Sequence, residues 1–351
     1  MYAPGVLRTL ATVACLSLTA LAGCPSPGTP PPQPPPAQPP QAPYAYPQQP
    51  PTYYPPPQQQ PQQQPQQPQQ PQQPQQPPPP FQRPLLPPLI GSAAMQQEVR
   101  TVLAELVQNL GASQKARVQG IPLVFDPGLE VNAFAGCEKG APFLAGTEGF
   151  LLAADAIAQT KATDEMFGTQ TYDAYCKLVI PQILRSEKAS PGLPAGIIPQ
   201  NVGGDPRRWS RARELFQDIV AFTFGHELAH HYLNHTGCAN GQPPGPNPAV
   251  IGNLLNSLIP ITNQPNEAAA DSSGAINALD TGAARLPAYR YSERGGLLLL
   301  EFFARLEQAM GVNPLSPVVF LQSHPNPQLR IPILRDVIAA GWYRAHPQIA
   351  R

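Results

Sequence analysis

The chain has 351 residues, of which 51 are proline, and its 22 basic and 22 acidic residues give a formal net charge of zero. This balance argues against nucleic acid as a partner, because such binding requires a strongly basic surface. No aspartate, glutamate or lysine precedes Glu98. The folded part is therefore expected to start near residue 90 and to comprise about 260 residues, enough for one domain with a sizeable core.

The first 23 residues are typical of an export signal. Arg8 precedes an apolar run over residues 10–21, which is too short to span a bilayer. The run leads through Leu-Ala-Gly to Cys24, an arrangement that resembles a bacterial lipobox. The resemblance implies cleavage before Cys24 and attachment of lipid to its thiol, which would hold the protein at a membrane. An ordinary secretory signal is the alternative.

Residues 24–92 are rich in proline and glutamine and are expected to form a disordered tether. Proline stiffens such a segment toward extended polyproline II, so the tether would carry the domain away from the membrane. Residue 25 is not aspartate. By analogy with bacterial lipoproteins, this favours the outer membrane of a Gram-negative-type cell, with the protein facing the periplasm. The tyrosines of the tether could contact a partner, and an inert tether is the alternative. The cell wall and the outer-membrane assembly machinery are candidate partners of the protein.

Residues 93–351 are expected to form one α+β domain that is predominantly helical. The first helix is predicted over residues 95–110, and three short strands are predicted at 121–125, 131–135 and 142–145. Further helices are predicted, in chain order, at residues 149–159, 164–186, 205–235, 250–258, 265–279, 297–310 and 328–342. The apolar helix at 297–310 is too short to cross a bilayer and is expected in the core.

The helix predicted at 205–235 has the strongest chemical signal. An Asp-Pro pair is typical of its start, and Gly237 is expected to end it. His226 and His230 share one face of this helix, and Glu227 flanks them. In zinc hydrolases this His-Glu-x-x-His pattern supplies two imidazole ligands and a carboxylate that takes a proton from water. A buried helix with hydrogen-bonded histidines is the alternative.

A third ligand for such an ion is expected from the helix at 265–279. Glu267 and Asp271 lie one turn apart on the same face of this helix. Glu267 would complete a site of two histidines and one glutamate, and Asp271 would accept a hydrogen bond from a ligand imidazole. The three alanines between the acids favour a buried face; two acids on a solvated face are the alternative.

Three motifs over residues 95–340 resemble those of the gluzincin metallopeptidases of the HtpX and CAAX prenyl endopeptidase group. They are His226-Glu-x-x-His230, Glu267-x-x-Ala-Asp271, and Ser-His324-Pro followed by Arg330. The resemblance implies a gluzincin domain with a small β-sheet beside the metal helix and one zinc ion per chain. Because no transmembrane helix is predicted in the domain, the resemblance is to the soluble, lipid-anchored periplasmic branch.

The same resemblance assigns roles to individual residues. It implies three zinc ligands, a general base, a carboxylate that supports a ligand, and two residues near the substrate or the transition-state oxyanion. The zinc ligands are His226, His230 and Glu267, and the general base is Glu227. Asp271 is the supporting carboxylate, and His324 and Arg330 are the two residues near the substrate or the oxyanion.

The segment from Val131 to Phe134 is similar to the edge strand of this family. Through Asn132, Ala133 and Phe134 it would pair with an extended polypeptide substrate. We therefore expect a zinc-dependent endopeptidase that cleaves peptide bonds of unfolded or misassembled envelope proteins, a role in protein quality control. A chaperone-like or structural envelope lipoprotein with a non-catalytic zinc site is the alternative. A cell-wall lipoprotein whose Pro-Gln tract is the working part is a third reading. A zinc hydrolase of peptidoglycan cross-links is a further one, for which the sequence has no motif.

The remaining cysteines and histidines are less informative. Three cysteines outside the signal and the lipidation site allow at most one internal disulfide, and the sequence leaves its pairing open. They are Cys137, Cys176 and Cys238. His235 fits the histidine often found past the metal motif of the family, whereas His231 and His346 are expected on the surface or in packing.

Overall fold

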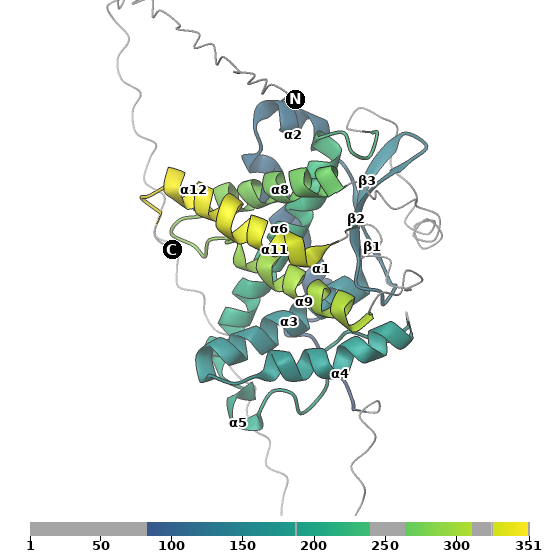
Figure 1. Cartoon of the computed structure of the whole chain (residues 1–351), viewed down its shortest axis with the longest axis vertical. Coiled ribbons are helices and arrows are strands. Elements are labelled where there is room, and N and C mark those ends of the chain that lie inside the picture. The colour runs from purple at the N-terminus through teal and green to yellow at the C-terminus, as the bar shows by residue number, and fades with distance from the viewer. Residues whose placement is uncertain (1–82, 187, 239–263, 311–323, 325, 350–351) are drawn as a thin grey trace, which may run out of the picture. The chain divides into compact units, whose positions relative to one another are not determined.

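The computed structural model describes most of the domain, as Figure 1 shows. It covers residues 83–186, 188–238, 264–310, 324 and 326–349. The predicted signal, the lipidation site Cys24, most of the tether and the helix expected at 250–258 lie outside these residues. Among the described residues, no helix has the length and apolarity that a membrane crossing requires.

Helices dominate the described residues and three strands form one small sheet, which confirms the predicted α+β class. The helices are α1 (Ser92–Asn109), α2 (Ala112–Val118), α3 (Glu148–Phe167), α4 (Thr171–Arg185), α5 (Gln200–Gly203), α6 (Pro206–Tyr232), α8 (Gln264–Ala284), α9 (Arg294–Met310), α11 (Pro327–Pro332), the π-helix η2 (Ile333–Ala339) and α12 (Ala340–Ala345). The strands are β1 (Leu123–Asp126), β2 (Ala133–Glu138) and β3 (Ala141–Thr147).

The sheet has the strand order β1-β3-β2, so β2 is an edge strand. β1 runs parallel to β3, whereas β2 runs antiparallel to it. The rings of Phe134 and Phe143 pack edge to face across these two strands, with centroids 5.7 Å apart. Because this contact and the hydrogen-bonded ladder both fix β2 against β3, the other edge of β2 is held at a defined place in the fold.

Helix α6 begins as the sequence predicts but ends earlier. The Asp205 side chain accepts a hydrogen bond from a backbone N–H of the first turn over 2.9 Å, so it caps the helix. At the other end the backbone of Asn234 adopts the left-handed conformation, and the N–H of His235 donates to the carbonyl oxygen of His230 over 2.7 Å. This Schellman turn ends the helix before the expected stop at Gly237, so that prediction was wrong.

Helices α6 and α8 cross at two glycines. A Cβ on Gly274 would lie 2.5 Å from the backbone nitrogen of His226, and a Cβ on Gly225 would lie 2.8 Å from the carbonyl oxygen of Gly274. The two backbones are therefore in direct contact. Asp271 and Glu267 precede Gly274 by three and seven residues and share its helix face. The crossing thus brings both carboxylates against the histidines of α6.

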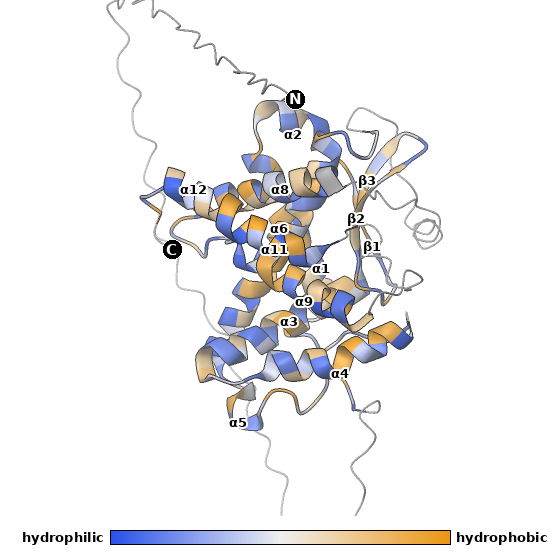
Figure 2. Ribbon diagram, in the orientation of Figure 1, coloured by the Kyte–Doolittle hydropathy of each residue, from blue (hydrophilic) through white to orange (hydrophobic). Residues whose placement is uncertain are grey.

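The helices around this crossing are amphipathic. α4 buries a stripe at helical spacing, and Figure 2 shows hydrophobic and hydrophilic residues in turn along this helix. The residues of this stripe are Thr171, Tyr172, Tyr175, Cys176, Val179, Ile180 and Ile183. α9 likewise buries Phe302 and Phe303, as expected for the apolar helix predicted at 297–310. The buried faces of α4 and α9 belong to the same hydrophobic core as the buried face of α6.

The segment predicted as one helix over residues 164–186 consists of two helices. α3 continues to Phe167 and ends at left-handed Gly168, while Asp164 accepts the backbone N–H of Thr171 over 2.6 Å and so stabilises the start of α4. The short helices α2 and α5 were not predicted. The helix predicted at 328–342 is found as the succession α11, η2 and α12.

A disulfide joins Cys137 of β2 to Cys238, which follows α6, with their Cα atoms 6.0 Å apart. Cys176 is buried and carries a free thiol. The disulfide therefore ties the edge strand β2 to the segment that follows α6.

Candidate metal centre

Four buried side chains from three parts of the chain meet at the crossing of α6 and α8. They are His226 and His230 of α6, Glu267 of α8 and His324, which precedes α11. One donor atom from each lies within 4.8 Å of the others, and these side chains are only 2–4% exposed. Such a group of imidazoles and a carboxylate could bind a metal ion.

The donor atoms of the two α6 histidines and of Glu267 face one another. His226 Nε2 and His230 Nε2 are 3.0 Å apart. Glu267 Oε2 lies 3.4 Å from His226 Nε2, and Glu267 Oε1 lies 3.3 Å from His230 Nε2. Within the described residues, Oε1 of this buried carboxylate accepts no hydrogen bond. A buried carboxylate oxygen without a donor is costly, and a cation at the centre of the three groups would satisfy it.

His324 belongs to the cluster as a fourth candidate ligand. Its Nδ1 lies 2.7 Å from Glu267 Oε2, and its Nε2 lies 3.6 Å from Glu227 Oε1. The family resemblance placed His324 near the substrate or the oxyanion, and the structure places it beside the Glu267 carboxylate as well. No helical periodicity could have indicated this, because His324 comes 57 residues after Glu267.

Glu227 is buried beside the cluster and is held by the sheet. Its Oε2 accepts a hydrogen bond from the backbone N–H of Ala135 over 2.7 Å. Ala135 lies in the edge strand β2, so this N–H points away from β3. Burial raises the pKa of Glu227 above its ordinary value. The carboxylate is thus both oriented and made more basic by its surroundings.

Asp271 and Arg330 support His226 from the side opposite its metal-facing nitrogen. Asp271 Oδ1 lies 2.9 Å from His226 Nδ1, so it can accept the Nδ1 proton and leave Nε2 as a lone pair. Arg330 donates to both oxygens of Asp271 over 2.7 and 2.6 Å. Burial raises the pKa of Asp271, but Arg330 and His226 together lower it to about 2.

The guanidinium of Arg330 is therefore occupied by carboxylates. Besides its pair with Asp271, it lies 3.5 Å from Glu267 Oε2. The resemblance placed Arg330 near the substrate or the oxyanion. This geometry instead favours a role through Asp271, because a bidentate guanidinium–carboxylate pair fixes the group that orients the imidazole.

The charged groups of the cluster shift one another's pKa values. Burial raises the pKa of Glu267, but the neighbouring histidines, His324 first among them, hold it well below its usual range. Burial lowers the pKa of His226, but the carboxylates of Asp271 and Glu267 raise it above its usual value. The pKa of His230 is lowered, mainly by burial. These carboxylates therefore favour positive charge at the centre of the cluster.

Three further histidines have defined places in the structure. His235 Nδ1 lies 3.0 Å from His230 Nδ1. His231 Nε2 lies 2.9 Å from the carbonyl oxygen of Phe143 and so ties α6 to β3. His346 stacks on Trp342 with ring centroids 4.3 Å apart. The last two contacts are those of packing histidines. Sequence spacing could not have indicated the contact of His235, because it depends on the turn that ends α6.

The predicted substrate strand is found at the edge of the sheet. Asn132 directly precedes β2, and Ala133 and Phe134 are its first residues. All three residues are buried as whole residues, backbone included. The pairing of this edge with a polypeptide stays a prediction.

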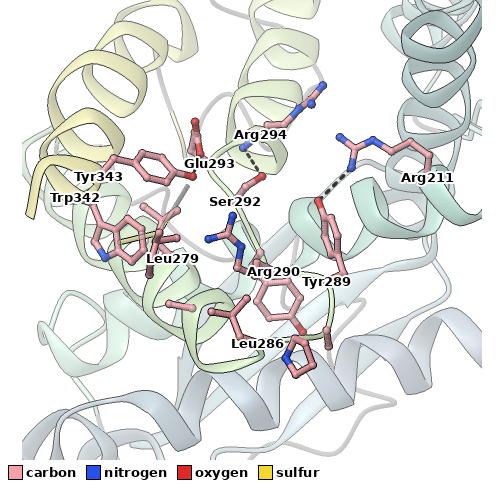
Figure 3. Close-up of a pocket in the computed structure, with 15 residues that line it drawn as sticks. Arg211, Leu279, Leu286, Tyr289, Arg290, Ser292, Glu293, Arg294, Trp342 and Tyr343 are labelled. Atoms are coloured by element: carbon pink, nitrogen blue, oxygen red, sulfur yellow. Dashed lines mark hydrogen bonds between the residues drawn. The ribbon is translucent and has the colours of Figure 1, made fainter. Parts of the chain in front are cut away.

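A cavity of about 520 Å³ lies elsewhere, at the end of α8, along the α8–α9 connection and beside Trp342 of α12 (Figure 3). Its polar side chains hold this connection in place. Tyr289 donates its O–H to Asp218 over 2.8 Å, and Arg211 donates to the Tyr289 oxygen over 3.4 Å. No ligand atom of the four-residue cluster lines this cavity. The cluster, rather than this cavity, is therefore the candidate functional site.

Comparison of the chain with known protein families, with curated proteins and with solved structures gave no match.

Proposed function

We propose that the protein is a zinc-dependent endopeptidase of the gluzincin type, similar to the HtpX and CAAX prenyl endopeptidase group. The observation that carries this proposal is the convergence of His226, His230 and Glu267 beside a buried carboxylate, Glu227, which a β-edge orients. Metal ligands alone would be compatible with many functions. A base within the same buried group is what favours hydrolysis.

The donor set and its spacing fit zinc. Donor atoms on a tetrahedral zinc ion with bonds of about 2.1 Å lie about 3.4 Å apart. The two imidazole Nε2 atoms are 3.0 Å apart, and the Glu267 carboxylate lies 3.4 Å from Nε2 of His226 through Oε2 and 3.3 Å from Nε2 of His230 through Oε1. Imidazole nitrogens also argue against magnesium and calcium, which prefer oxygen ligands. These residues would therefore hold one zinc ion per chain.

The residues around the ligands suggest how the chain would act on a peptide bond. Zinc, when bound, supplies Lewis acidity that activates water and polarises a carbonyl group. Glu227 would accept a proton from the attacking water and deliver it to the leaving amine. Since Ala135 holds Oε2 of this carboxylate, Oε1, which lies 3.6 Å from His324 Nε2, is the oxygen placed for proton transfer. His324 could then donate to the developing oxyanion.

The substrate class follows from the edge strand. Where a strand edge takes up a polypeptide, it pairs with the backbone of an extended segment and reads few side chains. This suits unfolded or misassembled polypeptides, which we place in the cell envelope because of the lipobox-like motif at Cys24. A lipid on Cys24 would hold the enzyme at the periplasmic face of the outer membrane. Fractionation of cells that express Cys24→Ser tests this part: the proposal requires that the protein leave the membrane fraction.

The peptidase activity is tested with purified protein and casein, with and without a zinc chelator. We expect cleavage that the chelator abolishes. Glu227→Gln should bind zinc stoichiometrically but cleave about 10²–10⁴-fold more slowly, the usual contribution of a general base. Glu214→Gln, at a partly exposed position of the same helix that pairs with Arg211, is the matched control and should cleave normally. Equal rates for wild type and Glu227→Gln would refute the assigned base.

A non-catalytic zinc site in a chaperone-like or structural lipoprotein is a second candidate, and the position of His324 favours it. With His324 the donors number four, and structural zinc sites are closed by four protein ligands, whereas catalytic sites keep one position open. His324→Ala separates the two. A structural site should lose zinc and thermal stability, while a catalytic site should keep zinc on the other three ligands.

A further inference from the structure

The turn that ends α6 brings a second imidazole against a candidate zinc ligand. Asn234 is left-handed, and the N–H of His235 donates to the carbonyl oxygen of His230. This folds the chain back, so that the ring of His235 meets that of His230 edge-on, with centroids 5.0 Å apart. The two Nδ1 atoms are 3.0 Å apart, which is hydrogen-bond distance. His235 is only partly buried.

A contact between two imidazole nitrogens needs one proton, and the metal site decides which nitrogen carries it. If Nε2 of His230 is a ligand, it must present a lone pair, and the proton of this neutral ring must be on Nδ1. Nδ1 of His230 then donates, Nδ1 of His235 accepts, and the proton of His235 is on its Nε2. The 3.0 Å contact is consistent with this single arrangement.

We infer that His235 is a positioning residue, which fixes the tautomer and the ring orientation of His230. The inference rests on the proposed zinc site. His235 does for His230 what Asp271 does for His226, but as a neutral acceptor instead of a carboxylate. Loss of the acceptor would leave the Nδ1–H of a buried ring without a partner and allow the ring to turn away from the metal.

Zinc affinity, measured by competition with a chromophoric chelator at one fixed pH, tests this role without any reference to catalysis. His235→Leu should weaken zinc binding about 10–100-fold, the usual effect of removing a group that orients a ligand. His235→Asn should bind nearly as tightly as wild type, because the amide oxygen can accept at the place of Nδ1. His346→Leu removes a histidine that stacks on Trp342 and is the matched control, with affinity unchanged.

A spectroscopic measurement separates hydrogen bonding from packing. In the zinc-loaded protein labelled with ¹⁵N-histidine, the Nδ1–H resonance of His230 should be protected in wild type and His235→Asn and should exchange with water in His235→Leu. Equal loss of affinity in both variants, or a protected resonance in His235→Leu, would overturn the inference. If wild type binds zinc but cleaves no casein, only the proposed peptidase activity fails. If wild type binds no zinc, both fail.

Discussion

The close crossing of α6 and α8 makes a prediction about a residue that carries no functional group. In Gly274→Ala the new Cβ would lie 2.5 Å from the nitrogen of His226 and 2.6 Å from the carbonyl carbon of Gly225, whereas ordinary contacts begin near 3.4 Å. Both atoms are backbone, so no side chain can move aside. The helices must therefore separate by about 1 Å, and such overpacking costs about 1–3 kcal/mol.

The separation of the helices should weaken zinc binding more than it lowers the stability of the fold. Alanine favours a helix over glycine by about 1 kcal/mol, so the net loss of unfolding free energy should be about 0–2 kcal/mol, at most a few degrees in melting temperature. Metal bonds tolerate only about 0.2 Å, so a shift of Glu267 away from His226 and His230 should weaken zinc binding at least about tenfold. Differential scanning calorimetry and chelator competition measure the two effects.

Gly341→Ala is the matched control for this experiment. Gly341 lies in α12, and a Cβ there would meet only the end of the Arg344 side chain, at 3.8 Å. This variant should keep its zinc affinity and its stability or gain slightly, because alanine favours the helix. If Gly274→Ala binds zinc as tightly as Gly341→Ala does, the contact at the crossing is not what places Glu267.

Three further predictions concern the surroundings of the site. Arg330→Gln leaves Asp271 without its buried partner, so zinc affinity should fall about 10–100-fold by chelator competition, while circular dichroism should show a folded but less stable protein. Burial raises the pKa of Asp218 from 3.8 to about 7. The stability linked to its proton is present below pH 3.8 and is lost as the pH rises through 7, so urea titrations should show a decrease on the order of 4 kcal/mol that Asp218→Asn abolishes. Removal of the disulfide by Cys137→Ser with Cys238→Ser should cost about 2–5 kcal/mol in the same titrations, and zinc should remain bound, because neither residue is a ligand.

Helix periodicity was sufficient to predict which residues of the candidate site lie side by side on the same helix. Two histidines four residues apart and two acids four residues apart each share a helix face wherever the helices lie in the fold. The sequence therefore placed His226 beside His230 and Glu267 beside Asp271. The small sheet was also predictable, since each short strand is bounded by turn residues.

The meeting of these two helices could not be derived from periodicity. It depends on Gly225 and Gly274, and nothing in the sequence pairs one glycine with the other. The same holds for the disulfide, whose cysteines are separated by 101 residues. The end of α6 was mispredicted because Asn234, not the later glycine, adopts the left-handed conformation, and the contact of His235 depends on that turn.

The charge balance of the buried cluster supports a cation at its centre. Glu227, Glu267 and Asp271 contribute three carboxylates, whereas Arg330 contributes one guanidinium, and all four side chains are buried. With neutral histidines and ionised acids this leaves two uncompensated negative charges, and burying each costs several kcal/mol. A protonated His226 would offset one of them, and its raised pKa reflects that demand. A divalent ion on the imidazoles offsets both. A role for the histidines in hydrogen bonding alone would leave this negative charge unbalanced, whereas a bound cation would balance it.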